Sequence, residues 1–139
     1  IITAGSGAPI GVFIYRDIAN IGARAPTQRP NVSGNPNISN PTVDRWFDTS
    51  VFSEPAPYTF GNAGRNIIIG PGYQYWTLGV FKNFTIKERH RIQFRAEFFN
   101  AFNNVNLSNP DTHFDSPTFG HISSSDPARQ IQFGLKYSF

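Results

Sequence analysis

A polar stretch in the last third of the chain contains the residues best suited to bind a metal ion. Asp111, His113 and Asp115 place oxygen and nitrogen donors at alternate positions. Such donors can ligate a divalent cation, but the same residue types are common in loops that only face water. We expect a solvated loop at this position, with no metal ion and no other cofactor.

Residue types that catalyse hydrolysis also occur, but not in a catalytic arrangement. Ser123 to Ser125 lie close in sequence to His121 and Asp126, with neither the spacing nor the nucleophile elbow of a hydrolase. Gly70-Pro71-Gly72 is expected to form a turn, because a phosphate-binding loop requires a following helix. We therefore expect no enzymatic activity.

The composition favours strands joined by polar loops. The chain has 139 residues, enough for one modest domain, and 14 of them are Phe. Its 12 Gly and 11 Pro disfavour helices. No stretch reaches the run of about 20 apolar residues that a membrane helix requires. A membrane strand carries its signal as alternation instead, so low overall hydropathy is compatible with a barrel.

Charge and cysteine content exclude other classes. The net charge of +3 comes from scattered Lys and Arg, without the basic cluster that nucleic-acid binding requires. Cysteine is absent, which excludes a disulfide framework and thiolate metal sites. The chain starts at Ile1 without a signal peptide, so we expect a mature or cleaved piece of an exported protein.

Alternating hydrophobic residues predict four long antiparallel strands, near residues 9–15, 73–86, 90–102 and 130–139. Period-two alternation of this length is typical of a sheet with one apolar and one polar face. The side chains predicted to face lipid are Trp76, Leu78, Val80, Phe84, Ile92, Phe94, Phe98 and Ile131. The side chains predicted to face the lumen are Arg91, Gln93, Arg95, Glu97, Gln132 and Lys136. Two aromatic residues, Phe81 and Phe99, fall on the lumen side, either packed there or shifted by a β-bulge.

The connections have the asymmetry of an outer-membrane barrel. Long irregular segments at 16–72 and 103–128 are expected to be extracellular, and the short polar turn at 87–90 periplasmic. The fold class is therefore all-β: about four long amphipathic strands of a transmembrane β-barrel in the bacterial outer membrane. Arg91, Arg95 and Glu97 could line a substrate path, but charged rows face the lumen of any wide barrel.

The last strand carries a further pattern. Phe133, Leu135, Tyr137 and the terminal Phe139 occupy alternate positions on its lipid face. An aromatic C-terminal residue preceded by alternating apolar residues resembles the signal that the barrel-assembly machinery reads. The alternative interpretation is a soluble edge strand that happens to end in Phe.

Several motifs together resemble the C-terminal end of TonB-dependent receptors. The most similar receptors carry an N-terminal carboxypeptidase-regulatory-like domain and are common in Acidobacteria. The resemblance spans roughly residue 29 to the end, and its motifs are Asn40-Pro41-Thr42, Asp44-Arg45-Trp46-Phe47, Phe60-Gly61-Asn62-Ala63-Gly64-Arg65-Asn66, Gly70-Pro71-Gly72, Phe81-Lys82-Asn83-Phe84, Arg95-Ala96-Glu97-Phe98-Phe99-Asn100, Phe102-Asn103, Ser116-Pro117-Thr118-Phe119-Gly120 and Arg129-Gln130-Ile131-Gln132-Phe133.

The resemblance implies a barrel of about 22 strands, a plug domain inside it and an energy-coupling box. This chain would supply about four of those strands and could not perform uptake alone. A sheet of this size has two unpaired edges, so we expect the partners to be lipid, the barrel-assembly machinery, and either the missing barrel strands or copies of the chain itself.

The alternative function is a cleaved fragment, released outside the cell, whose copies join edge to edge into a ring, tube or filament. A third interpretation is a soluble carbohydrate-binding β-sandwich.

Overall fold

The computed structural model describes residues 1–22, 28–86 and 90–139. The all-β, antiparallel fold class predicted from the sequence is confirmed. The described residues contain one helical turn, the 3₁₀ helix η1 (Thr49–Val51), which Asp48 caps by accepting a hydrogen bond from the Ser50 N–H. No described helix has the length and apolar character to cross a membrane.

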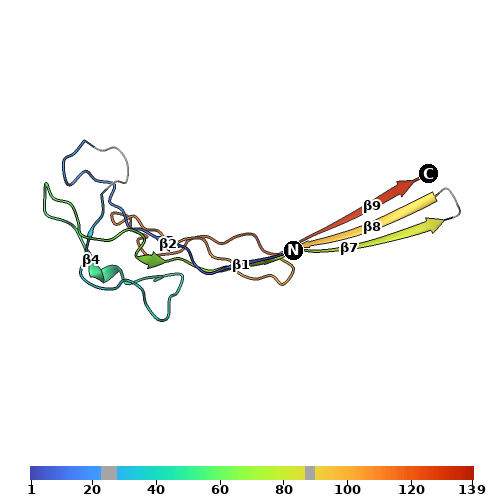
Figure 1. The fold of residues 1–139 in the computed structure, drawn as a ribbon, viewed down its shortest axis with the longest axis horizontal. Helices are drawn as coiled ribbons and strands as arrows, with labels where there is room; N and C mark the ends of the chain where they lie inside the picture. Colours follow the sequence, from blue (N-terminus) through green and yellow to red (C-terminus); the bar gives the residue numbers. More distant parts are fainter. Residues whose placement is uncertain (23–27, 87–89) are drawn as a thin grey trace. The chain divides into compact units, whose positions relative to one another are not determined.

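Three long strands form one sheet in the order β7-β8-β9 (Figure 1). They are β7 (Leu78–Ile86), β8 (His90–Phe99) and β9 (Gln130–Ser138). The register is continuous, and Leu78 pairs with Phe98, which in turn pairs with Ile131. Residues 87–89 of the predicted turn at 87–90 lie outside the described residues. These strands belong to a compact unit, which we name the strand unit (Ile1–Ser6, Gly72–Asn106 and Ser125–Phe139).

A second, smaller pairing completes the strand unit. Strand β1 (Ile2–Gly5) pairs antiparallel with β6 (Tyr73–Trp76). The pairing continues past both strands, because the backbone N–H of Thr77 donates to the carbonyl of Ile1 at 2.8 Å. On its other side β6 reaches the end of β8, where the Ala101 N–H donates to the carbonyl of Trp76 at 2.8 Å.

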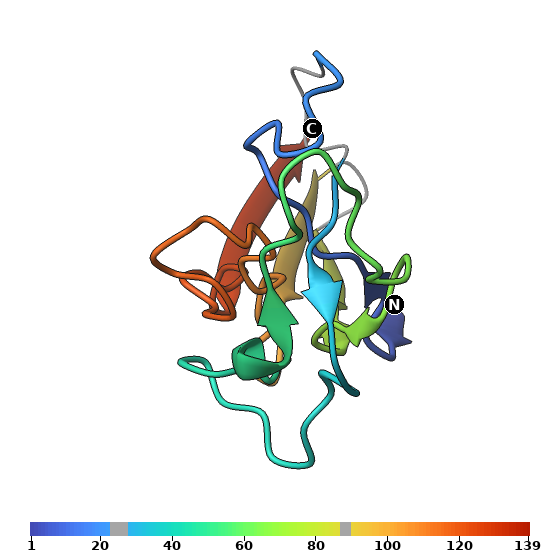
Figure 2. The ribbon, with the colours of Figure 1, turned by 90° about the vertical axis from the view of Figure 1, so that its left-hand side faces the viewer.

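The remaining residues form a second compact unit, the loop unit (Gly7–Pro71 and Leu107–Ser124). Apart from η1, the regular structure of its described residues is limited to two-residue strands. β2 (Pro9–Ile10) pairs with β5 (Ile68–Ile69), and β3 (Asn31–Val32) pairs with β4 (Phe52–Ser53), seen side by side in Figure 2. Side chains add further ties, since Asn62 accepts from the Val32 N–H at 2.7 Å and donates its own N–H to Asn31 at 3.2 Å.

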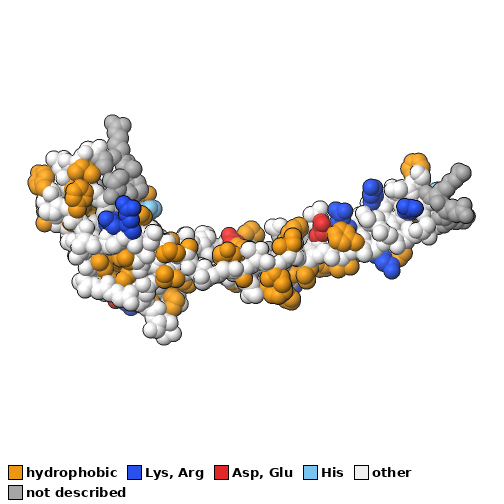
Figure 3. Space-filling model, viewed as in Figure 1, with side chains coloured by type: hydrophobic (Ala, Val, Ile, Leu, Met, Phe, Trp, Pro, Cys, Tyr) orange, Lys and Arg blue, Asp and Glu red, His pale blue; other side chains and the backbone are white. Residues whose placement is uncertain are grey.

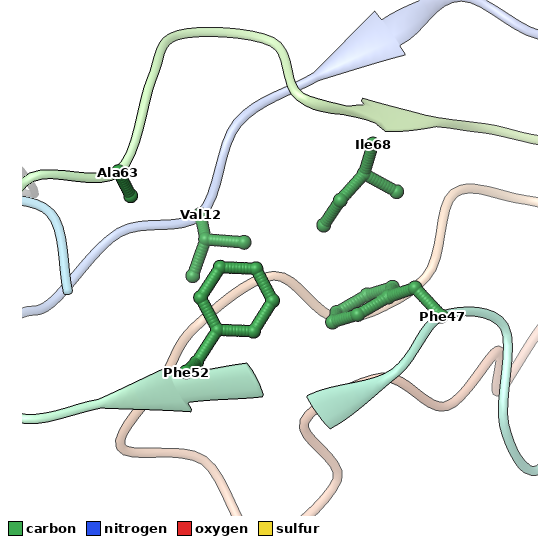
Figure 4. Packing of buried hydrophobic residues seen from close by; sticks show 5 residues of the cluster. All are labelled: Val12, Phe47, Phe52, Ala63 and Ile68. Atoms are coloured by element: carbon green, nitrogen blue, oxygen red, sulfur yellow. The ribbon is translucent and has the colours of Figure 1, made fainter. Parts of the chain in front are cut away.

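An aromatic core holds the loop unit together. Its fully or nearly buried members are Val12, Phe47, Phe52, Ala63 and Ile68 (Figure 4). The ring of Phe47 packs edge-on against Phe52, with centroids 6.0 Å apart, and against Phe119 at 5.2 Å. Edge-to-face pairs of this kind add to the stabilisation from burial alone. The described residues of the segment 16–72, predicted as an irregular loop, therefore pack around a core that they share with Val12 and with Phe119 of the segment 103–128.

The predicted long strand at 9–15 is wrong. Only Pro9 and Ile10 form a strand, and the chain then makes single bridges from Phe13 to His113 and from Ile14 to Gln28. The segment is extended and apolar, as its sequence indicates, but its backbone partners come from three different segments. A continuous ladder, which a membrane-crossing strand requires, does not form.

Two other strands differ from their predicted ranges, one by an interruption and one by an earlier end. The strand predicted at 73–86 is interrupted at Thr77 and divides into β6 and β7. The strand predicted at 90–102 ends at Phe99, because Asn100 and Asn103 adopt left-handed conformations with φ of 50° and 57°. Asn100 stabilises this turn by donating to the carbonyl of Asn104 at 2.9 Å.

Candidate functional site

The register of β7, β8 and β9 collects the apolar side chains on one face of the sheet. Residues paired directly across an antiparallel sheet lie on the same face. The apolar face consists of Leu78, Val80, Phe84, Ile86, Ile92, Phe94, Ala96, Phe98, Ile131, Phe133, Leu135 and Tyr137, with Lys82 and His90 among them. Every residue of the three strands that the sequence predicted to face lipid lies on this face.

The apolar face is exposed rather than enclosed. Phe133 and Leu135 keep 68% and 73% of their surface accessible, and Val80 keeps 56%. Hydrophobic side chains lie at the surface in the space-filling view (Figure 3). A continuous exposed apolar face of this size marks a surface that is covered by lipid or by another protein.

One charged residue interrupts the apolar face. Lys82 lies between Val80 and Phe84 on β7 and pairs with Phe94 on β8, and its ammonium group is 5.9 Å from the centre of the Phe84 ring. A long lysine side chain covers apolar surface with its stem while its charged end reaches a polar layer. This arrangement makes Lys82 compatible with an apolar environment at its Cβ.

The opposite face is polar and hollowed. Its residues include all six that the sequence predicted to face the lumen, namely Arg91, Gln93, Arg95, Glu97, Gln132 and Lys136. A recess of about 260 Å³ is lined by polar residues of β8 and β9, including Arg95 and Lys136. A second recess of about 350 Å³ lies over Asn83, Arg91 and Lys136.

Charges on the polar face are only loosely paired. The guanidinium of Arg95 is 4.0 Å from the carboxylate of Glu97, at the limit of an ion pair, and Gln93 donates to Asn83 at 3.0 Å. Exposed pairs of this kind contribute little stability, about 0–1 kcal/mol. The polar side chains therefore remain accessible to solvent.

Two aromatic residues, Phe81 and Phe99, lie on the polar face, and the register contains no bulge at either. The Arg95 guanidinium lies 5.1 Å from the centre of the Phe81 ring, a cation–π contact. Phe99 pairs with Gln130 at the end of β9 and is 40% exposed. Of the two explanations that the sequence left open, the β-bulge is wrong, and a packing contact on the polar face is found for Phe81.

Aromatic residues also mark both ends of the sheet. Tyr137 stacks on His90 with centroids 5.8 Å apart, and its hydroxyl is 2.5 Å from the His90 ring nitrogen. Trp76, predicted to face lipid, lies in β6 beyond the three-stranded sheet and packs edge-on against Phe102 at 5.2 Å. Amphipathic rings at strand ends suit the two interfaces of a bilayer.

The suspected metal-binding residues serve a different purpose. Asp115 accepts hydrogen bonds from the Arg16 guanidinium at 2.7 and 3.0 Å, and Arg16 also pairs with Glu54 at 2.9 Å. Asp111 accepts from the Thr118 hydroxyl at 2.7 Å and from the His113 N–H at 2.9 Å. Over the described ranges, no group of three or more acidic, His or Cys residues is arranged to hold a metal ion.

These contacts change the acidity of both carboxylates. Partial burial alone would raise the pKa of Asp115, but the hydrogen bonds and charge of Arg16 outweigh it and hold that pKa below its usual range. The pKa of Asp111 is likewise lowered, because its hydrogen bonds to Ser116, His113 and Thr118 outweigh the effect of burial. Both carboxylates are therefore charged at neutral pH, and their hydrogen bonds link residues within the loop unit.

Two of the suspected hydrolytic residues have other side-chain partners. Ser124 donates its hydroxyl to Ser108 at 2.9 Å, and Asp126 accepts a hydrogen bond from the Tyr75 hydroxyl. At His121 the backbone carbonyl accepts from the Asp111 N–H at 2.8 Å. The Arg16–Asp115–Glu54 network was missed from the sequence, because its members are separated by 38 and 99 residues and no local pattern links them.

Comparison with known proteins gives one match. A family model described as an outer membrane beta barrel domain matches residues 1–132. No curated protein and no solved structure matches the chain.

Proposed function

The chain belongs to the outer membrane beta barrel domain family. We propose that it forms part of the C-terminal barrel wall of a TonB-dependent receptor. Such barrels lie in the outer membrane of bacteria. The observation that carries the proposal is the uninterrupted register of β7, β8 and β9, which separates an apolar face from a polar one. The motif resemblance supports the assignment to this receptor type.

In this proposal the apolar face contacts lipid and the polar face lines the lumen. Strands β7 and β9 are nine residues long and β8 is ten, close to the roughly 9–11 residues that cross a bilayer at a tilt. The loop unit is extracellular. The chain contributes to transport as a structural wall, not as a catalyst, and requires the plug and the other strands of its receptor for uptake.

The four residues Phe133, Leu135, Tyr137 and Phe139 are proposed to be read by the barrel-assembly machinery. The exposure of these side chains supports this proposal. Each keeps more than half of its surface accessible, and Phe139 keeps 92%. Alternate side chains on one exposed face are available to a partner before the barrel closes.

Single cysteines test the orientation of the sheet, because the chain has none of its own. Val80→Cys and Phe133→Cys probe the apolar face, and Gln93→Cys and Gln132→Cys probe the polar face of the receptor in lipid vesicles. An environment-sensitive dye on the first pair should be quenched by brominated lipids, and on the second pair by aqueous iodide. Equal quenching at all four positions would contradict a lipid-facing and a lumen-facing side.

A second candidate function is self-assembly of the chain into a ring, tube or filament. It is favoured by the outer edges of β7 and β9, which have no strand partner among residues 1–22, 28–86 and 90–139. Unpaired edges present rows of backbone donors and acceptors to another chain. Sedimentation of the isolated chain without detergent tests it: large ordered assemblies are expected, and a folded monomer would refute this candidate while leaving the receptor proposal intact.

A further inference from the structure

A recess in the loop unit has the features of a ligand site. It has a volume of about 320 Å³ and is lined by Gly11, Phe13, Arg29, Arg65 and Asn66. This volume is at the lower end of the range for small-molecule sites, which begins at about 300 Å³. Its two charged side chains come from segments 36 positions apart in the sequence and carry the same sign.

The two arginines of the recess differ from the other described arginines of the loop unit. Arg16 is paired with Asp115 and Glu54, and Arg45 is paired with Asp48 at 2.9 Å. Neither Arg29 nor Arg65 makes an ion pair or a side-chain hydrogen bond within the described parts of the chain. Among the described arginines of the loop unit, the two without a partner thus line the recess, where an anion would find positive charge that is not already neutralised.

The backbone around Arg29 is held firmly. Its neighbours Gln28 and Pro30 are both buried. The carbonyl of Gln28 accepts from the Ile14 N–H at 2.9 Å, and the carbonyl of Pro30 accepts from the Ala63 N–H at 3.0 Å. Arg29 is itself only partly exposed, so its side chain is already restricted. Binding a ligand therefore costs less conformational entropy than it would at a fully exposed arginine.

The rest of the recess is formed by an aromatic ring and closely packed backbone. A Cβ placed on the buried Gly11 would lie 3.3 Å from the Phe13 ring and 3.5 Å from the Asn66 backbone nitrogen. A side chain at Gly11 would therefore crowd that ring and the backbone at Asn66. Phe13 is fixed by backbone hydrogen bonds, since it donates to Thr112 at 3.1 Å and accepts from Phe114 at 2.9 Å.

We propose that this recess binds a small ligand that carries an oxyanion on a flat apolar ring. The guanidinium groups of Arg29 and Arg65 bind the oxyanion, because planar guanidinium donors match the geometry of carboxylate and phosphate oxygens. The Phe13 ring contacts the apolar part of the ligand. The inference does not depend on the receptor proposal, since binding is measured on the folded chain without transport.

Calorimetric titration of the full chain in detergent micelles with four probes tests the site. Benzoate and phenyl phosphate carry both an anion and a ring, benzamide has the ring without the charge, and inorganic phosphate has the charge without the ring. We expect one or both ring anions to bind at least tenfold more tightly than benzamide and inorganic phosphate. The tighter of the two identifies the anion as carboxylate or phosphate.

Variants connect the binding to the recess. Arg29→Gln and Arg65→Gln should each weaken binding of the ring anion at least tenfold, and Arg29→Lys should weaken it less because it keeps the charge. Arg129→Gln is the charge-matched control, since this exposed side chain lies outside the recess, and it should bind as the native chain does. Circular dichroism verifies that each variant is folded.

The proposal is overturned if neither ring anion binds the native chain, or if benzamide binds as tightly as benzoate and phenyl phosphate. Both comparisons use the native chain, so they remain decisive even where a variant fails to fold. Equal binding by the native chain and a folded double variant, Arg29→Gln with Arg65→Gln, would also overturn it.

Discussion

Single residues in the loop unit have roles that depend on their immediate surroundings. Gly120 has a φ of 86°, in the left-handed region where a side chain is strained, and a Cβ there would lie 2.7 Å from a methyl group of Thr49. Its carbonyl accepts the Trp46 N–H at 2.9 Å and its own N–H donates to Asp111 at 2.9 Å. The position therefore joins two segments of the loop unit through a conformation that favours glycine.

Gly120→Ala should destabilise the loop unit by about 1–3 kcal/mol, because strain in the backbone adds to the contact with Thr49. Urea unfolding monitored by near-ultraviolet circular dichroism measures the change. The matched control is Gly34→Ala, where the added Cβ would meet Val51 only at 3.8 Å. Equal stability of the two variants would show that the conformation of Gly120 is not required.

The carboxylate of Asp115 should make the loop unit sensitive to acid. Its pKa is lowered from the ordinary value of 3.8 in the folded chain. A carboxylate with a lowered pKa contributes its full stability above that ordinary value, and the contribution is lost as the pH falls through the folded pKa. Stability of the loop unit should therefore be constant near neutrality and decrease below about pH 4.

Asp115→Asn should reduce stability at pH 7 and flatten its decrease in acid, since the ion pair with Arg16 is lost at every pH. Urea unfolding between pH 3 and pH 7 measures both effects. Asp44→Asn is the control, because Asp44 is exposed and takes part in no ion pair within the described residues. If the two variants show the same pH profile, the Arg16–Asp115 contact does not cause the acid sensitivity.

At the scale of the elements, the strands of the long sheet have faces that suit different solvents. Adjacent residues of β9 illustrate the difference, because Phe133 pairs with Ala96 on the apolar face and Gln132 pairs with Glu97 on the polar face. The two positions lie at almost the same depth along the strand. In the proposed barrel, a charged side chain would meet lipid at one of them and water at the other.

Phe133→Arg should destabilise the membrane-inserted sheet by about 2–4 kcal/mol, the cost of arginine on the lipid face near the middle of a barrel strand. Gln132→Arg should change stability by less than about 1 kcal/mol, because it places the same charge on the polar face beside Glu97. Unfolding by urea in lipid vesicles compares them. A larger loss for Gln132→Arg would reverse our assignment of the two faces.

At the scale of the molecule, burial is distributed unequally between the two units. All the buried hydrophobic side chains of the described residues except Ala96 belong to the loop unit. The strand unit instead has an exposed apolar face and hydrogen-bonded strands. The loop unit thus contains the hydrophobic core that stabilises a fold in water, whereas we propose that the strand unit depends on lipid or a partner.

Amide hydrogen exchange with and without lipid vesicles should separate the two units. Lipid should slow exchange in β7, β8 and β9 by tenfold or more, because it covers their apolar face. Exchange at Ile14 and Phe47, both buried in the loop unit, should be unaffected by lipid. Lipid-dependent protection at these two buried positions would contradict an independent loop-unit core.

The sequence alone was sufficient to predict the all-β class and the two faces of the long strands. Side-chain alternation is a local property of an extended chain. Successive residues of a strand point to opposite faces, so the sequence alone assigns the residues of β8 and β9 to their two faces. The prediction of apolar and polar faces depended on no distant contact.

Only the tertiary structure decided the remaining features. The segment at 9–15 has the alternation of a strand, but Phe13 and Ile14 bridge to different partners, His113 and Gln28, and these choices depend on contacts between distant residues. The Arg16–Asp115 pair and the recess of Arg29 and Arg65 arise in the same way. Folding brings together residues that no short sequence pattern connects, since the free energy of packing depends on all segments at once.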